Sequence, residues 1–292
     1  MTGPIESATP ALCRFILGSE LRRLRIESAM TAAAVAKRFH WGASKVNRLE
    51  TAANGRVPVL DVRVLCQLYG ASAETTAMLE GYAQVTTSNR DWWQSEEYRP
   101  VIKPGFKAFL TVESTAQSTH TYESEFVPGL LQNEAYVRAI HQRGHTGLDE
   151  ETIDKLVAVR VMRQEALQRT LAPLKLTAVI NEAVLRRRVG GPRVMRDQLL
   201  HMIELAALSN IKLQVVPFSI GVHPGMNGPF ATFRFRDSAF KPIVYVENLA
   251  SAGISRREDD VEKYEEAFSD LQAVAPGPEE SLKMIEQASK EL

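Results

Sequence analysis

Five neighbouring residues combine side chains suited to recognising double-stranded DNA: Ala43, Ser44, Lys45, Asn47 and Arg48. An Arg side chain can pair bidentately with guanine and an Asn with adenine, whereas Ala can only touch a thymine methyl group. Lys45 and the nearby Arg56 are better suited to backbone phosphates, which position a protein without specifying the DNA sequence. The stretch therefore has the residue types of a DNA-reading segment.

Apolar residues inside this stretch place it on a helix. Val46 and Leu49 recur at helical spacing, so the segment has an apolar rear and a polar front. Just upstream, Thr31 can cap another helix in which Val35 and Ala36 face inward. In a helix-turn-helix, the second helix lies in the major groove while the first braces it across the backbone. Periodicity alone is equally compatible with an ordinary small helical domain that carries Lys and Arg on its surface.

The surrounding sequence predicts a small all-α domain of five helices over residues 17–86. Helical spacing of apolar residues begins at Leu17. Pro58 suits the first turn of a fourth helix, Gly70 ends it, and Ser72 can cap a fifth. Residues 1–16 contain Pro and Ser without periodicity, so we expect a flexible N-terminus.

Residues 87–103 are predicted to connect this domain to a second one. The segment is polar and contains the adjacent residues Trp92 and Trp93. Two Trp rings could stack on bases, but in a connecting segment they more often pack against protein, and we prefer the packing interpretation.

Residues 104–292 have the pattern of an α+β domain. Strand signals occur at 118–122, 174–181, 211–218, 230–235 and 242–248, where β-branched and aromatic residues are frequent. Helical stretches separate them, including one that Pro128 is expected to start and one between the second and third strands, which gives a βαβ-like unit. Two helices end the chain. The chain is therefore predicted to hold a small mixed sheet flanked by helices, behind an all-α domain.

Charge is balanced over the whole chain but segregated along it. The 292 residues hold 35 Lys and Arg against 35 Asp and Glu. Basic residues dominate 37–56, where Glu50 is the only acid, and acids dominate from Glu258 onward. A polyanion would approach the first segment and be repelled by the second. Two solvated helix faces of opposite sign are the alternative, and we prefer it for the acidic end.

The cysteine content and the apolar runs of the sequence indicate the cellular compartment of the protein. Cys13 and Cys66 are the only cysteines, which favours a reducing compartment. The sequence has no long apolar run and no basic-then-apolar start, so neither a membrane span nor a secretory signal is predicted. We expect a cytoplasmic protein with no membrane partner.

The second domain offers one candidate ligand site. The stretch VVPFSIGVHPGMNGPF is rich in Gly and Pro and contains His223, Asn227 and Phe230. Loops of this kind often line pockets, and a structural turn is the alternative that we favour. His141 and His145 have no evident third ligand, so no metal is predicted. No nucleophile, acid pair or phosphate loop is evident, so neither a cofactor nor an enzyme activity is expected.

Longer motifs settle the choice left open by periodicity. The stretch LGSELRRLRIESAMTAAAVAKRFHWGASKVNRLE resembles the N-terminal helix-turn-helix of the Xre/Cro-like transcriptional regulators. Downstream, DWW, PGF, VPGLLQ, VINEAVLRR, VVPFS and VYVE resemble the second domain of the actinomycete subfamily, a domain of unknown function. The resemblance covers nearly the whole chain from Leu17.

The resemblance implies a sequence-specific DNA-binding regulator that works as a homodimer. Members of the subfamily are pleiotropic regulators of development and antibiotic production, and many are encoded beside a small protein of another uncharacterised family. It therefore also implies a protein partner from an adjacent gene, in a paired, antitoxin-like arrangement. The resemblance also implies that Thr31 and Ala32 contact DNA, in addition to Arg56 and the five residues named first.

Four positions depart from the pattern that the family usually shows. Gln is usual where this chain has Ala32 and Ala43, Gly is usual at His40, and Ser or Thr is usual at the capping position Gly42. A residue at His40 must tolerate or avoid a left-handed backbone. We expect altered or weakened base specificity with surviving phosphate contacts. The alternative function is an antitoxin-like interaction module that sequesters a small partner and reads DNA weakly.

Overall fold

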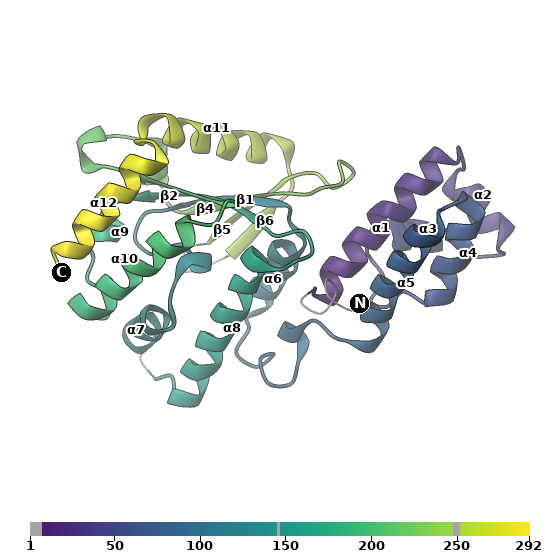
Figure 1. Ribbon diagram of the computed structural model, residues 1–292, viewed down its shortest axis with the longest axis horizontal. Coiled ribbons are helices and arrows are strands. Elements are labelled where there is room, and N and C mark those ends of the chain that lie inside the picture. Colours follow the sequence, from purple (N-terminus) through teal and green to yellow (C-terminus); the bar gives the residue numbers. More distant parts are fainter. Residues whose placement is uncertain (1–7, 145–146, 248–251) are drawn as a thin grey trace. The chain divides into compact units, whose positions relative to one another are not determined.

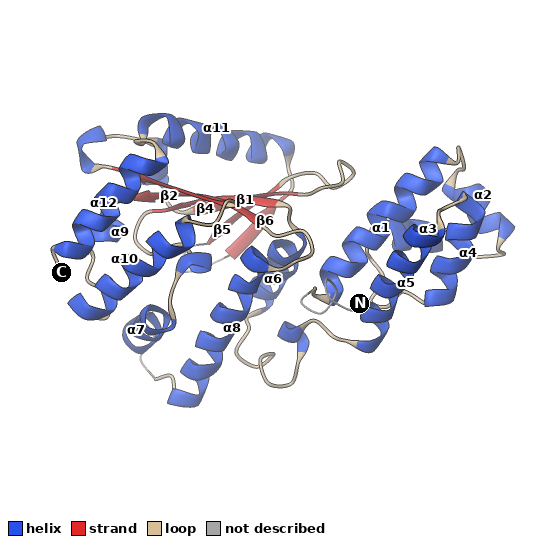
Figure 2. Ribbon diagram, in the orientation of Figure 1, coloured by secondary structure: helices blue, strands red, loops and turns tan. Residues whose placement is uncertain are grey.

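The computed structural model describes residues 8–144, 147–247 and 252–292, which divide into two units, Met1–Glu96 and Glu97–Leu292. The first unit is helical and the second is an α+β fold built on a mixed sheet, as the sequence predicts (Figures 1 and 2). The division falls within the 87–103 segment. Among the described residues, no helix combines the length and apolar character needed to cross a membrane.

Five helices build the first unit. They are α1 (Pro10–Glu27), α2 (Ala32–Arg38), α3 (Lys45–Glu50), α4 (Val59–Tyr69) and α5 (Ala73–Ser88), followed by the short 3-10 turn η1 (Trp92–Gln94). The predicted caps of α2 and α5 are confirmed, because the Thr31 and Ser72 hydroxyls accept hydrogen bonds from Ala34 N and Thr75 N, each at 3.1 Å. Gly70 ends α4 with a left-handed φ of 72°.

The N-terminal segment differs from the prediction. Helix α1 begins at Pro10 rather than at Leu17, so residues 10–16 are not a flexible end. The Thr9 hydroxyl caps the helix, and Ala11 N donates to the Asp91 carboxylate at 2.7 Å. A helix start satisfied in this way can bury Leu12 and Cys13. The anchor, Asp91, lies 80 positions away, which local periodicity cannot reveal.

The adjacent tryptophans follow the packing interpretation. Trp93 is 1% exposed, and the Trp92 ring meets it edge-on with centroids 5.2 Å apart. A ring buried in this way cannot stack on a base.

The second unit contains one six-stranded sheet with the order β3-β2-β1-β4-β5-β6. Strands β1 to β3 are parallel, and the other neighbouring pairs are antiparallel. Five of the strands were predicted, whereas β6 was not, since its Ala, Gly and Ser residues have weak strand propensity. The strands are β1 (Ser118–Glu123), β2 (Lys175–Asn181), β3 (Ile211–Val216), β4 (Phe230–Arg234), β5 (Ile243–Glu247) and β6 (Ala252–Ser255).

Helices cover both faces of the sheet (Figure 1). Helix α11 (Glu258–Val274) lies on one face. The opposite face is covered by α6 (Pro104–Thr115), α7 (Glu134–Gly144), α8 (Glu150–Gln168) and α10 (Pro192–Ala206). Helix α12 (Pro278–Lys290) packs on β3 and α10, and the short α9 (Glu182–Arg186) follows β2.

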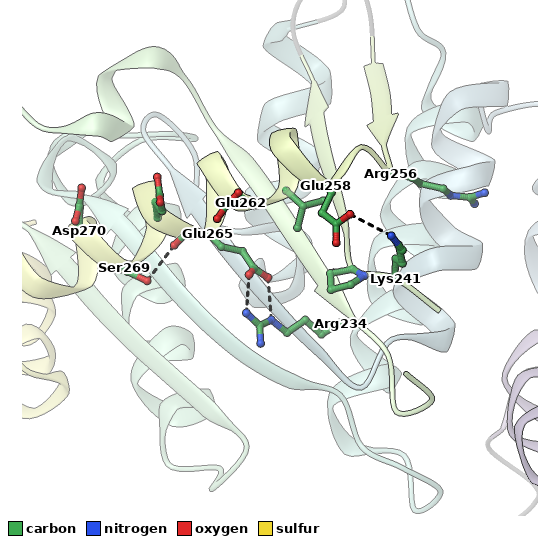
Figure 3. Close-up of a pocket in the computed structure, with 11 residues that line it drawn as sticks. Arg234, Lys241, Arg256, Glu258, Glu262, Glu265, Ser269 and Asp270 are labelled. Carbon is green, nitrogen blue, oxygen red and sulfur yellow. Dashed lines mark hydrogen bonds and ion pairs between the residues drawn. The ribbon is translucent and has the colours of Figure 1, made fainter. Parts of the chain in front are cut away.

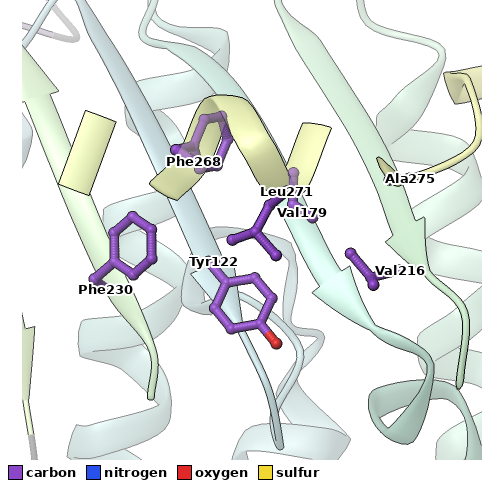
Figure 4. Close-up of a cluster of buried hydrophobic side chains, with 7 residues drawn as sticks. All are labelled: Tyr122, Val179, Val216, Phe230, Phe268, Leu271 and Ala275. Atoms are coloured by element: carbon purple, nitrogen blue, oxygen red, sulfur yellow. The ribbon is translucent and has the colours of Figure 1, made fainter. Parts of the chain in front are cut away.

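The core on the α11 face joins four strands to that helix (Figure 4). It shows the period-two alternation expected of strands, because Tyr122, Val179, Val216 and Phe230 point toward α11 and their neighbours point away. One predicted helix start is wrong. Pro128 opens the 3-10 turn η2 (Gly129–Leu131), and α7 begins only at Glu134, where the Asn133 side chain accepts from Tyr136 N at 2.9 Å.

Candidate nucleic-acid interface

The turn between α2 and α3 is closed by backbone hydrogen bonds around a left-handed residue. His40 has φ 53°, Trp41 N donates to Ala36 O at 2.9 Å, and His40 N donates to Lys37 O at 3.2 Å. These two bonds form a Schellman motif, in which the left-handed position is usually Gly. His40 therefore tolerates the strained conformation rather than avoiding it. The Phe39 and Trp41 rings stack at 4.9 Å and flank this turn.

The start of α3 differs from the expected one. Gly42 does not cap the helix; its carbonyl accepts from Lys45 N at 2.9 Å in a turn, and Ser44 occupies the N-cap position. Ser44 has a helical backbone, so its hydroxyl is not directed at the free N–H groups and makes no capping bond. As a result, Ala43 and Ser44 precede the helix instead of forming its first turn.

Three polar side chains are exposed at the front of α3. Ser44, Asn47 and Arg48 are all open to solvent, while Val46 and Leu49 are each 1% exposed at the rear. The Arg48 guanidinium folds along the helix and donates to Ser44 Oγ and, at 3.3 Å, to Asn54 Oδ1. Both bonds are on the surface, so the arginine can exchange them for a base edge at little cost. Ala43 is exposed as well and offers only a methyl group.

The two predicted phosphate contacts have different surroundings. Lys45 Nζ lies 2.8 Å from Asp61 Oδ2 on α4 and 3.8 Å from the centroid of the Trp41 ring. Asp61 thus neutralises the charge of Lys45 within the protein. The basic residues of the segment 37–56 did not reveal this partner in the sequence. The Arg56 side chain is exposed and has no hydrogen bond or ion pair to any residue in the described part of the chain. Arg56 is therefore the better phosphate ligand of the two.

The remaining predicted contacts lie at the start of α2. Thr31 is exposed, but its hydroxyl is engaged in capping α2. Ala32, the first residue of α2, is half-buried and has no polar side-chain atom. The start of α2 can approach a backbone phosphate through main-chain groups, but Ala32 cannot replace the hydrogen bonds of the glutamine usual at this position.

A close backbone approach fixes α3 from behind. A Cβ atom added to Gly18 of α1 would lie 2.6 Å from Leu49 O and 2.8 Å from Glu50 O. Only glycine allows α1 to touch the carbonyl end of α3 at this distance. The Leu-Gly pair that begins the family motif therefore has a positional role, which the sequence showed only as part of the resemblance.

A buried ion pair ties the same helix ends together. Arg25 on α1 donates from Nε to Glu50 Oε1 at 2.6 Å and from Nη2 to Glu50 Oε2 at 2.8 Å. Its Nη1 donates to Met30 O in the turn before α2. The hydrogen bonds to Glu50 raise the pKa of Arg25, so the guanidinium group stays charged. Sequence analysis did not identify this pair, although Glu50 stood out as the one acid among basic residues.

The loop considered as a ligand site in the second unit is held by contacts of its own residues. Phe230 is buried in the core on β4, and Asn227 is exposed and bonds Pro224 O within its own turn at 3.1 Å. The buried His223 ring lies 3.3 Å from the Asn181 amide through Nε2 and meets the Tyr122 ring edge-on. Gly225 passes so close to Tyr122 that a Cβ atom would meet its ring at 2.3 Å. His223 and Phe230 thus lie against the same Tyr122 ring, whereas Asn227 is exposed to solvent.

The acidic end of the chain forms a groove along α11 (Figure 3). Arg234 and Lys241 line it but are already paired with Glu265 and Glu258. The acids in its lining outnumber the basic residues, so this surface would repel DNA. His145, considered with His141 for a metal, lies outside the described residues. Elsewhere in the described chain, no group of three or more His, Cys, Asp or Glu side chains is placed to hold a metal ion.

Comparison with known families matches both units separately. Residues 106–287, more than half of the chain, match the model of a domain of unknown function, DUF5753, and residues 16–79 match a helix-turn-helix domain. No curated protein and no solved structure matches the chain.

Proposed function

Because the chain belongs to the DUF5753 family and carries a helix-turn-helix domain ahead of that region, we propose that it is a sequence-specific transcriptional regulator acting on double-stranded DNA. The observation that carries the proposal is the exposed front of α3, where Asn47 and Arg48 stand on a helix, with Ser44 just before it, that Gly18 and the Arg25–Glu50 pair fix from behind. Side chains held on a rigid support can select bases, because little freedom is lost on binding.

The regulator would act as a homodimer. Helix α3 has only six residues, so one copy reaches few base pairs, and two half-sites related by two-fold symmetry multiply the specificity. The second unit would provide the dimer contacts and receive the controlling signal, from a ligand or from a small protein encoded beside it. The family resemblance suggests control of development or secondary metabolism.

The test is a footprint on the DNA upstream of its own gene, with base substitutions scanned across the protected site. Arg48→Ala should remove the preference at one position, worth about 1–3 kcal/mol for a good bidentate contact. Arg63→Ala, an exposed arginine on α4 that pairs with Glu80, is the matched control and should keep every preference. A protected site whose base preferences are the same in both variants would exclude readout by α3.

Salt dependence separates the two phosphate candidates. Arg56→Ala should make the slope of log affinity against log salt shallower by about one unit. Lys45→Ala should change it less, because Asp61 neutralises that charge in the free protein. Asp61→Asn frees Lys45 and should strengthen binding at low salt. If Asp61→Asn leaves affinity unchanged, Lys45 does not face the DNA backbone.

A second candidate function is an antitoxin-like module that sequesters a small partner and reads DNA weakly. It is favoured by the neutralised Lys45, by the lack of hydrogen-bonding groups at Ala32 and Ala43, and by apolar side chains exposed near the His223 turn, namely Phe218, Val222 and Met226. Val222, 90% exposed, should be the most sensitive.

The two functions predict different complexes. The full chain is co-purified with the product of the adjacent gene, with and without the upstream DNA. For the module, Val222→Asp should abolish capture of the partner while the exposed Arg193→Asp leaves it intact, and no DNA should be retained at low salt. Retention of the DNA without the partner would instead favour the regulator.

A further inference from the structure

Two arginines on one face of α8 meet beside a glycine backbone. Arg160 and Arg163 are one turn apart, and both approach Gly129 in the turn η2. A Cβ atom at Gly129 would lie 2.3 Å from Arg160 Nη1 and 3.1 Å from Arg163 Nη1. Because both nitrogens lie near one point, the two guanidinium groups are neighbours. Two adjacent positive charges repel each other unless an anion lies between them.

The protein supplies only part of the partners that these groups require. Arg163 pairs bidentately with Glu113 of α6, through Nε at 2.7 Å and Nη2 at 2.8 Å, and both side chains are 5% exposed. Arg163 Nη1 is buried and has no hydrogen-bond partner among the residues that the structure describes. Arg160 likewise makes no hydrogen bond or ion pair within the described chain. Buried donors without partners are rare in folded proteins and often mark a site for a missing group.

The position in the sheet is one that favours ligands. Glu123 ends β1 and Glu247 ends β5, and these strands run in the same direction because two antiparallel pairings separate them. Their neighbours Tyr122 and Val246 pack toward α11, so both carboxyl groups lie on the opposite face, which α6 and α8 cover. Strand β1 has the parallel strand β2 on one side and the antiparallel strand β4 on the other, so the direction in which strands are added to the sheet changes at β1. Ligands of open sheets bind at such a switch point, beyond the carboxyl ends of the strands.

Only one of the two arginines has a carboxylate bonded to it. Desolvation raises the pKa of Glu123 to about 8, which makes this carboxyl group a weak counter-ion for Arg160 at neutral pH. Desolvation and repulsion by Arg163 lower the pKa of Arg160 to about 9, which still leaves it charged. Glu247 attracts Arg160 only at longer range, and its carboxylate accepts a hydrogen bond from the Tyr245 hydroxyl at 2.9 Å. Arg160 therefore has no hydrogen-bonded carboxylate beside it in the described chain, whereas Arg163 has Glu113.

We propose that Arg160 and Arg163 bind the carboxylate of a small organic ligand beside Gly129. The free Nη1 of Arg163 and the unused donors of Arg160 can together hold two oxygens, as arginine forks commonly do. The Phe106 and Phe109 rings lie 5.2 and 4.9 Å from the Arg163 guanidinium and supply an apolar wall. A carboxylate fits better than a phosphate dianion, because Glu247 repels a second negative charge. This ligand would be the signal of the regulator, and in that role it rests on the proposed function.

The experiment measures binding without DNA, so its failure is distinguishable from a failure of DNA reading. The full chain is unfolded thermally at pH 7 and constant ionic strength, with sodium benzoate replacing sodium chloride, and a sodium phosphate arm is run in parallel. All three tryptophans lie in the first unit, at positions 41, 92 and 93. Trp fluorescence therefore follows the unfolding of the first unit. A transition in far-UV circular dichroism that does not coincide with the fluorescence transition reports the unfolding of the second unit. Above saturation, each tenfold increase in the ratio of benzoate concentration to its Kd is worth about 1.4 kcal/mol and should raise that transition by about 3–6 °C.

Two variants separate a binding role from a structural one. Arg160→Gln should lose the benzoate shift, while the melting temperature without benzoate stays the same or rises, because a half-buried charge without a bonded counter-ion is removed. Gly129→Ala should also reduce the shift, since its Cβ displaces Arg160. Arg193→Gln, an exposed arginine on α10, should keep the full shift.

Other results would overturn the proposal. They are the absence of a benzoate shift in the unsubstituted chain, an equal shift in Arg160→Gln, or a lower melting temperature of Arg160→Gln without benzoate. A phosphate shift larger than the benzoate shift would overturn the assignment of a carboxylate.

Discussion

Arg25 in the first unit and Arg160 in the second are both half-buried, yet their partners differ. Each nitrogen of the Arg25 guanidinium donates a hydrogen bond, two to Glu50 and one to a backbone carbonyl. Arg160 makes no such bond to any residue in the described part of the chain, although Arg163 beside it is half-satisfied by Glu113. A saturated arginine holds elements together, whereas an unsaturated one has donors left for a ligand.

The comparison indicates which polar groups of each unit remain available to bind another molecule. In the first unit, shielded charges serve the framework, and the exposed groups of α3 remain for recognition. In the second unit, donors without partners lie beneath two helices, which suits a small molecule rather than a macromolecule. The same residue type therefore has opposite roles, and only the hydrogen-bond partners separate them.

The largest expected effect comes from breaking the saturated pairs. Glu50→Ala and Glu113→Ala should each lower the free energy of unfolding of their unit by about 3–5 kcal/mol, because an arginine is left shielded from water without its partner. Urea titrations would follow Trp fluorescence for Glu50→Ala and circular dichroism for Glu113→Ala. The exposed Glu74→Ala on α5 is the control and should stay within about 0.5 kcal/mol. A loss below about 1 kcal/mol at Glu50 would mean that the pair does not support the first unit.

The second effect tests whether close packing, rather than charge, positions the reading helix. Gly18→Ala should cost about 1–3 kcal/mol, because its Cβ would overlap two carbonyl oxygens of α3 and must push the helices apart. Gly55→Ala, where a Cβ meets nothing within 4 Å, is the matched control. DNA affinity should fall with Gly18→Ala even under conditions where the variant is fully folded. Unchanged affinity and stability would show that α1 and α3 can separate without consequence.

The sequence predicted most elements of both units, because their apolar periodicity, caps and turn residues are local signals. Thr31, Ser72 and Gly70 all act as predicted. The predictions failed where long-range contacts decide, as at the start of α1, which Asp91 anchors from 80 positions away. The same reason explains the candidate site. Residue types marked Asn47 and Arg48 as exposed polar groups, but Asp61 as the partner of Lys45 and Glu50 as the partner of Arg25 are visible only in three dimensions.

A smaller effect of opposite sign is expected at the turn before α3. His40→Gly should raise the free energy of unfolding by about 1 kcal/mol, because glycine adopts the left-handed φ of 53° without strain. Ala34→Gly, at an exposed position inside α2, should instead lower it by about 1 kcal/mol, so the pair of variants separates turn strain from a general effect of glycine. Trp fluorescence in urea measures both. If His40→Gly is also destabilising, the His40 side chain contributes a contact that outweighs the strain.

The smallest effect is expected at an ion pair with the same geometry as the buried ones. Arg234 on β4 binds Glu265 on α11 through two hydrogen bonds of 2.8 and 2.7 Å, but the arginine side chain is 51% exposed. Arg234→Gln should therefore cost only about 0.2–1 kcal/mol, and the difference should shrink further in 1 M salt, where the Debye length falls to about 3 Å. Arg163→Gln, measured beside it by circular dichroism, should cost several times more and change little with salt. Two bidentate arginine pairs in one unit would then differ only in access to water, whereas Arg25 and Arg160 have similar access to water and differ in their hydrogen-bond partners.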